Sequence, residues 1–192
     1  IPPMIKIFID QGHNPTNPNA GAEANGVREQ DVTYEVGVRL ADLLRANPNF
    51  EVRLSRNSPD EQLGTSNATS LAARVNAANT PGGSTEPAQS DVSEPDTQTT
   101  ASGSEVYVYS ETSPAFPLGE AILVGLQNAT GLRNRGMFIR PSLYVLRRTN
   151  MPALLVEMGY LTNPEDARLL STDPQSFARG IYNGMLSYFQ LT

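Results

Sequence analysis

The chain has 192 residues, with 14 basic and 20 acidic side chains and a formal net charge of −6 at pH 7. This length suits one domain, and the acidic balance argues against nucleic acid as a ligand, because phosphate binding needs a clustered basic surface. The absence of cysteine excludes disulfides, cysteine-based zinc sites and thiol nucleophiles. The sequence also shows no apolar run long enough to span a membrane and no signal peptide, and it leaves export open.

The first predicted element is a buried strand that ends next to the only histidine of the chain. Ile5, Ile7 and Ile9 are β-branched, and the following Asp-Gln-Gly sequence breaks the strand. His13 therefore falls at the carboxyl end of a strand, where open α/β sheets keep their binding sites. Glu29 follows at the start of the next predicted helix, and zinc accepts both imidazole nitrogen and carboxylate oxygen. The pair is either half of a zinc site or a loop histidine beside a glutamate that the helix dipole favours.

The next segments alternate between helix and strand. Apolar residues fall on one face of a helix over 30–45, and alternation over 50–54 predicts a half-buried strand. A second helix is marked by Leu71, Val75 and Ala78. This βαβ order is typical of a parallel sheet with helical crossovers.

The segment 80–103 interrupts this alternation where a strand is due. Its sequence, TPGGSTEPAQSDVSEPDTQTTASG, contains one branched aliphatic residue, Val92, and is otherwise rich in Ser, Thr, Pro, Gly and acidic residues. Such a composition is typical of a linker. We therefore expect an irregular, linker-like segment here.

Regular structure is predicted again from 105 to the end. We expect a strand at 105–109, a helix at 115–128 and a short strand at 143–146. The apolar run 153–156 predicts a central parallel strand with Glu157 at its carboxyl end, on the same edge as His13. Asn163-Pro164 and Asp173-Pro174 each predict the start of a helix. The expected fold is thus one α/β domain over 1–192, with a twisted, mostly parallel sheet flanked by helices.

With these residues in place, the chain resembles the zinc-dependent N-acetylmuramoyl-L-alanine amidases of the amidase 3 type. The segments IFIDQGH and AGAEANGVREQDV are similar to the strand, histidine ligand, glycine-containing loop and glutamate ligand of that family. The long segment RNRGMFIRPSLYVLRRTNMPALLVEMGYLTNPEDARLL is similar to the family's last block, and SGSEVYVYS fits a further strand. The resemblance implies that His13 and Glu29 are metal ligands and that Glu157 is the catalytic glutamate.

The chain departs from this family in one place. Between the ARVNAAN-like helix and the SEVYVY-like strand, the family has a strand ending in a SIHAN-like motif, whose histidine is the third zinc ligand. Here that place is taken by 80–103, which contains only carboxylates as possible ligands, namely Glu86, Asp91, Glu94 and Asp96. Three explanations are open: a divergent, non-catalytic wall-binding module, a segment altered from the native sequence, or an active enzyme that recruits a carboxylate as third ligand.

The intact flanking blocks favour the enzyme. The resemblance implies that zinc and Glu157 activate water to cleave the amide between N-acetylmuramic acid and L-alanine of the stem peptide. Arg147 and Arg148 are candidates for binding a substrate carboxylate, but a surface charge explains both better. We expect a monomer that acts on peptidoglycan in a secreted, periplasmic or wall-associated setting. The alternative is a non-catalytic peptidoglycan-binding or regulatory domain.

Overall fold

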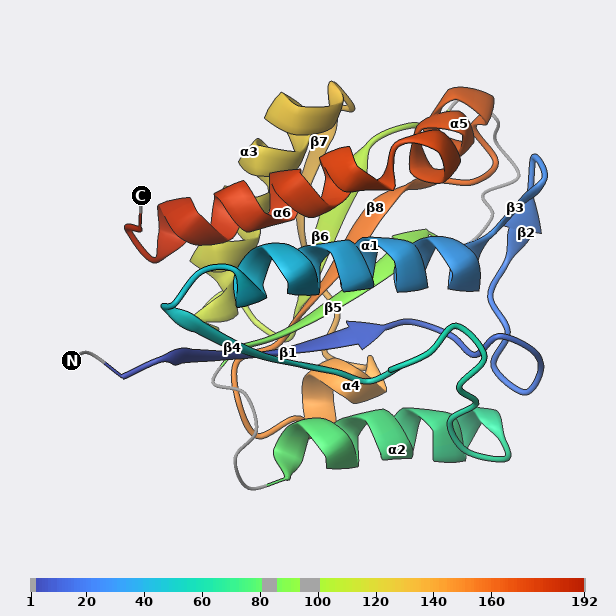
Figure 1. Cartoon of the computed structure of the whole chain (residues 1–192), viewed down its shortest axis with the longest axis horizontal. Helices are drawn as coiled ribbons and strands as arrows, with labels where there is room; N and C mark the ends of the chain where they lie inside the picture. The colour runs from blue at the N-terminus through green and yellow to red at the C-terminus, as the bar shows by residue number, and fades with distance from the viewer. Residues whose placement is uncertain (1–2, 81–85, 94–100, 192) are drawn as a thin grey trace.

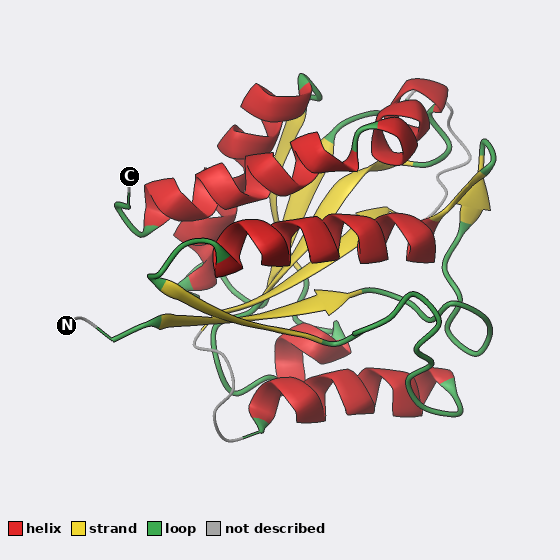
Figure 2. Cartoon of the chain, viewed as in Figure 1, coloured by secondary structure: helices red, strands yellow, loops and turns green. Residues whose placement is uncertain are grey.

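The computed structural model describes residues 3–80, 86–93 and 101–191, and of residues 86–93 it describes the main chain. A six-stranded sheet lies between helices on both faces, and a two-stranded hairpin projects from one end (Figures 1 and 2). The strands are β1 (Ile5–Gln11), β2 (Glu23–Ala24), β3 (Val27–Arg28), β4 (Phe50–Leu54), β5 (Glu86–Ser93), β6 (Ser104–Val108), β7 (Asn134–Ile139) and β8 (Leu154–Tyr160). The helices are α1 (Glu29–Arg45), α2 (Asn67–Asn79), α3 (Ala115–Thr130), α4 (Tyr144–Arg148), α5 (Pro164–Thr172) and α6 (Pro174–Tyr188).

The sheet has the strand order β4-β1-β5-β8-β6-β7. The first four of these strands run parallel to one another, β6 is antiparallel to β8, and β7 is parallel to β6. The expectation of a mostly parallel sheet in an α/β domain is therefore confirmed. The topology brings the carboxyl ends of β1, β5 and β8 to one edge, together with the amino end of β6.

Helices α1, α3 and α6 cover one face of the sheet, and α2 and α4 cover the other (Figure 1). The main core lies under the first group, where residues spaced four apart on α1 pack against inward-facing residues of β1, β6 and β8. Its central members are Ile7, Ile9, Val36, Leu40, Val106, Leu126, Val156, Phe177 and Ile181.

Helices α3 and α6 approach each other unusually closely because glycines lie at their crossing. A Cβ atom added at Gly125 would lie 2.1 Å from the carbonyl oxygen of Gly180, and one added at Gly184 would lie 2.5 Å from Cα of Ile122. Side chains at these positions would push the two helices apart. The glycines therefore set the depth at which α6 docks on the core.

The segment 80–103 differs from the sequence-based expectation. Residues 86–93 form β5, a central strand that pairs in parallel with β1 on one side and β8 on the other. The expectation of an irregular segment is wrong for these eight residues, while 81–85 and 94–100 lie outside the described residues. The composition misled because main-chain pairing with two neighbouring strands does not require apolar or β-branched side chains.

Two smaller differences concern short elements. The apolar run at 143–146 was expected to be a strand, but the structure has the helix α4 there, because a run of four apolar residues shows no clear period. Strand β7 and the β2–β3 hairpin were not predicted. In contrast, both Pro-initiated helices are confirmed, with Asn163 and Asp173 accepting hydrogen bonds from main-chain N–H groups in the first turns of α5 and α6.

Within the described part of the chain, no helix is both long enough and apolar enough to cross a membrane.

Candidate active site

His13 and Glu29 meet at the edge where β1 ends and α1 begins. His13 lies two residues beyond the last residue of β1, and Glu29 is the first residue of α1. The Nε2 atom of His13 is 3.0 Å from Oε1 of Glu29, and the side chains are 20% and 1% exposed. The structure therefore joins these two predicted site residues in one contact, at the positive end of the α1 dipole, which favours the glutamate carboxylate.

The loop before α1 holds the Glu29 carboxylate in place. The main-chain N–H of Ala22 donates a hydrogen bond to Glu29 Oε1 at 3.0 Å, and the N–H of Glu29 donates to the carbonyl of Ala22 at 2.9 Å. Gly21 permits this close approach, since a Cβ there would lie 2.6 Å from Cβ of Glu29. The Oε1 atom of this carboxylate is thus in contact with both the loop and His13.

The end of β1 is fastened to the neighbouring elements. The Gln11 side chain donates to the carbonyl of Arg56 at 3.1 Å and accepts from the N–H of Arg56 at 2.9 Å. The Thr33 hydroxyl of α1 donates to the carbonyl of Gly12 at 2.7 Å. These buried bonds hold Gln11 and Gly12, the two residues directly before His13, in place.

Glu157 lies in the middle of β8 (Leu154–Tyr160) and not at its carboxyl end as expected, because the strand continues for three residues beyond it. Gln11, Ser90 and Val156 are in register across β1, β5 and β8, so Glu157 is level with Gly12. Its side chain is buried, at 6% exposure. In the turn that follows β8, Asp166 accepts from the N–H of Tyr160 at 3.0 Å and Asn163 caps α5.

A second buried carboxylate lies directly across from Glu157. Glu105 on β6 is its register partner, and the Tyr107 hydroxyl donates to Glu105 Oε1 at 2.5 Å. Arg135 on β7 pairs with Glu105 Oε2 at 3.3 Å. Burial, the bond to Glu105 and the charge of Glu157 raise the pKa of the Tyr107 phenol above its usual value. The sequence analysis did not identify Glu105 or Tyr107, because only the antiparallel pairing of β6 brings them beside Glu157.

The donor set fits a zinc ion in part. One imidazole nitrogen and one carboxylate oxygen converge, and both are common zinc ligands. Among residues whose side chains the structure describes, no group of three His, Cys, Asp or Glu residues comes together. His13 and Glu29 therefore suit two of the usual three protein ligands of a catalytic zinc, and a third has to come from elsewhere.

Arg147 and Arg148 do not join this site. Both are exposed at the end of α4, before β8 begins at Leu154, and so at the edge opposite to Glu157. Arg147 instead lines a separate pocket with Tyr109 and Met151.

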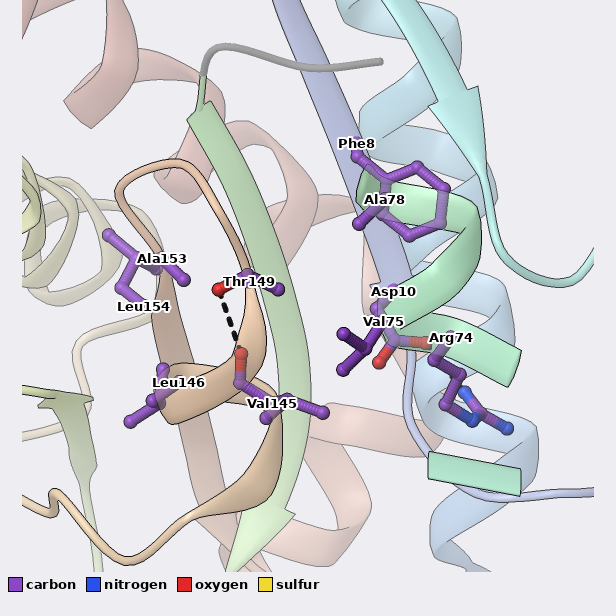
Figure 3. A pocket seen from close by; sticks show the side chains of 10 residues that line it. All are labelled: Phe8, Asp10, Arg74, Val75, Ala78, Val145, Leu146, Thr149, Ala153 and Leu154. Atoms are coloured by element: carbon purple, nitrogen blue, oxygen red, sulfur yellow. Dashed lines mark hydrogen bonds and ion pairs between the residues drawn. The ribbon is translucent and has the colours of Figure 1, made fainter. Parts of the chain in front are cut away.

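Another pocket lies over the sheet face that α2 and α4 cover (Figure 3). Val75, Leu146 and Leu154 contribute apolar side chains to its lining. Asp10 and Arg74 also line it, and they form an ion pair with 2.6 Å between Oδ1 and Nη1 (Figure 3). Arg74 also donates to the carbonyl of His13, but neither His13 nor Glu29 lines this pocket. The pocket is therefore next to a residue that holds the His13 loop, not next to the His13–Glu29 pair.

Known proteins are similar to this chain in both sequence and fold. Over 193 aligned residues, the chain is 34% identical to the N-acetylmuramoyl-L-alanine amidase CwlM of Bacillus licheniformis, covering 98% of this chain and 70% of that protein. Over 192 residues, it is 33% identical to the sporulation-specific N-acetylmuramoyl-L-alanine amidase of Bacillus subtilis, covering 98% and 69%.

Solved structures agree. An N-acetylmuramoyl-L-alanine amidase from Clostridium difficile superposes with a TM-score of 0.86 at 25% identity and covers 98% of both chains. The amidase AmiC2 of Nostoc punctiforme gives a TM-score of 0.82 at 28% identity and covers 97% of both. The Amidase_3 model, described as N-acetylmuramoyl-L-alanine amidase, matches residues 7–187. The chain thus belongs to the Amidase_3 family of N-acetylmuramoyl-L-alanine amidases.

Proposed function

We propose that this chain cleaves the amide between N-acetylmuramic acid and L-alanine in peptidoglycan by zinc-assisted attack of water. The observation that carries the proposal is the His13–Glu29 contact at the sheet edge that β8 shares, in a chain that matches the family over 7–187. His13 and Glu29 would hold the metal, and Glu157 would serve as the general base. The substrate places the protein at the cell wall, on the outer side of the membrane.

Bound zinc and Glu157 would have different roles in the reaction. Bound zinc would polarise the amide carbonyl and lower the pKa of water. Glu157 would accept the proton of the attacking water and pass it to the leaving amine, a transfer that contributes about 10²–10⁴-fold in rate. Glu157 is buried and lies across from Glu105 on the neighbouring strand β6.

We further propose Asp91 as the third metal ligand. Glu86 begins β5 and so lies at the opposite edge of the sheet. Asp91 is in register with Glu157, near the carboxyl end of β5. A carboxylate oxygen is an accepted zinc ligand, although histidine at this position would be the more usual choice.

Glu157→Gln tests the role of the base. The variant should fold and bind zinc as the parent does but lose roughly 10²–10⁴-fold in turnover on peptidoglycan fragments. His13→Ala should instead lose the metal, measured as zinc content after dialysis. If Glu157→Gln cleaves the amide normally, the assignment of the base is wrong. A parent protein that binds wall fragments but neither binds zinc nor cleaves the amide would be the non-catalytic wall-binding domain.

Asp91→His and Asp91→Asn test the third ligand. Zinc affinity, measured by competition with a chelating dye, should rise in the histidine variant and fall about tenfold or more in the asparagine variant. Asp173→Asn is a suitable control, because Asp173 caps α6 on another part of the fold. Equal affinities of Asp91→Asn and the parent would exclude Asp91 as a ligand, without excluding the function of His13 and Glu29.

A further inference from the structure

We infer that Arg74 is a positioning residue that holds the backbone of His13 in the conformation its metal role requires. This inference rests on the proposed function of His13. Arg74 lies on α2, remote in sequence from His13, and its side chain reaches the end of β1. Its Nη2 atom donates to the carbonyl oxygen of His13 at 2.7 Å, and Nη1 donates to the carbonyl oxygen of Gln11 at 2.6 Å.

His13 has a backbone that needs such support. Its φ angle is +68°, in the left-handed region that residues with a Cβ atom rarely adopt. A residue persists in this region only when its surroundings over-determine it, and such residues gather at functional sites. The bonds from Arg74 to carbonyls on either side of Gly12, together with the bond from Thr33 to Gly12 itself, supply that constraint.

The guanidinium is itself fixed in direction. Arg74 is 2% exposed, and its charge pairs with Asp10 at 2.6 Å between Nη1 and Oδ1. Nη2 also donates to Asn14 Oδ1 at 3.2 Å, and Nε donates to the Ser70 hydroxyl at 3.4 Å. A rigid fork of donors therefore meets acceptors on residues 10, 11, 13 and 14, a set that a lysine ammonium cannot reach from one point.

A purely structural role would need only part of this arrangement. The Asp10 carboxylate alone would neutralise the buried charge, yet the shortest remaining bonds go to the main chain around the metal ligand. Arg53 offers a matched comparison. It also ties α2 to the sheet, donating to the carbonyl of Ala77 at 2.8 Å, and its guanidinium stacks on Phe8, but within the described part of the chain it does not contact the His13 loop.

The experiment compares Arg74→Lys with Arg53→Lys. Zinc affinity is measured by competition at a temperature where circular dichroism shows both variants folded. Because the chain has one histidine, the imidazole proton signals in NMR spectra of an untagged, metal-free sample report on His13 alone. We expect Arg74→Lys to bind zinc about tenfold more weakly and to shift or broaden those signals, while Arg53→Lys leaves both unchanged.

Asp10→Asn provides a second variant that separates the ion pair from the carbonyl bonds. It should lower the melting temperature and change the His13 signals and the zinc affinity much less than Arg74→Lys does, since Arg74 keeps its main-chain acceptors. The inference is overturned if Arg74→Lys and Arg53→Lys are alike in both readouts, or if Asp10→Asn weakens zinc binding tenfold. A parent that binds no zinc would refute the proposed function, and the metal-free His13 signals would still decide the role of Arg74.

Discussion

Strands β1 and β5 are neighbours in the sheet and end at the same edge, but they are held in place by different kinds of contact. Strand β1 buries Ile7, Phe8 and Ile9, and its carboxyl end is held by side chains of α1 and α2 and by the bond from its own Gln11 side chain to Arg56. Strand β5 has a polar sequence and is placed by main-chain pairing with β1 and β8. The comparison teaches that side-chain bonds hold one half of the site, whereas main-chain pairing with neighbouring strands places the other half.

The largest effect is expected from breaking the support of β1. Arg74→Met removes one partner of a buried ion pair and leaves the Asp10 carboxylate uncompensated, so the free energy of unfolding should fall by about 3–5 kcal/mol. Urea denaturation followed by circular dichroism measures this loss. The double variant Asp10→Asn with Arg74→Met should recover part of it. A loss below about 1 kcal/mol would mean that water reaches this pair.

A proline in β5 tests the other half of the comparison. Gln89 lies between Asp10 and Leu155 in register, so Gln89→Pro removes a main-chain donor from a central strand and should cost roughly 2–3 kcal/mol of unfolding free energy. Gln89→Thr keeps the N–H group and should be nearly neutral. A linker would tolerate both changes equally, so equal midpoints in urea would argue against the pairing of β5.

A smaller effect is expected at the bond from α1 to the loop. Thr33→Val preserves shape but leaves the buried carbonyl of Gly12 without the hydroxyl that lies 2.7 Å away, at a cost of about 1–2 kcal/mol. Thermal unfolding compared with Thr172→Val, an exposed threonine on α5, measures the difference. Similar midpoints for the two variants would show that the Gly12 carbonyl finds another donor.

The smallest effect concerns packing alone. Ile9→Val deletes one methylene group from a fully buried side chain of β1 and should cost about 1 kcal/mol. Because the site is held by polar contacts beyond residue 9, zinc affinity should stay the same. A parallel loss of zinc affinity would show that core packing under β1, rather than the bonds at its end, sets the position of His13.

Where hydrophobic periodicity is strong, the sequence predicted the fold well. The helix over 30–45, the strand over 50–54 and the buried strand before Glu157 all have an unambiguous period or a continuous apolar run, and the structure contains each of them. Strand β5 could not be predicted this way, since its place comes from pairing between segments far apart in the chain. The prediction for the segment that forms α4 was wrong for a related reason, because a helix of little more than one turn is too short to show a period.

The candidate site divides in the same way. The contact between His13 and Glu29 was predicted from the ends of two elements. Glu157 was expected at the end of its strand; it instead lies within β8, at the level where β1 ends. No pattern in the sequence indicated that Glu105 or Arg74 belongs near the site. One depends on an antiparallel pairing, and the other on an arginine that points from a distant helix onto main-chain carbonyls.

The close docking of α6 on α3 has a consequence for how the protein is made. Helix α6 ends at Tyr188 and supplies the fully buried Phe177, Ile181 and Met185, and its glycines touch the backbone of α3. A growing chain that has not yet produced this segment exposes the apolar faces that these residues cover. The domain therefore completes its core only when translation has passed α6, so a nascent or truncated amidase is expected to remain inactive and open to proteolysis.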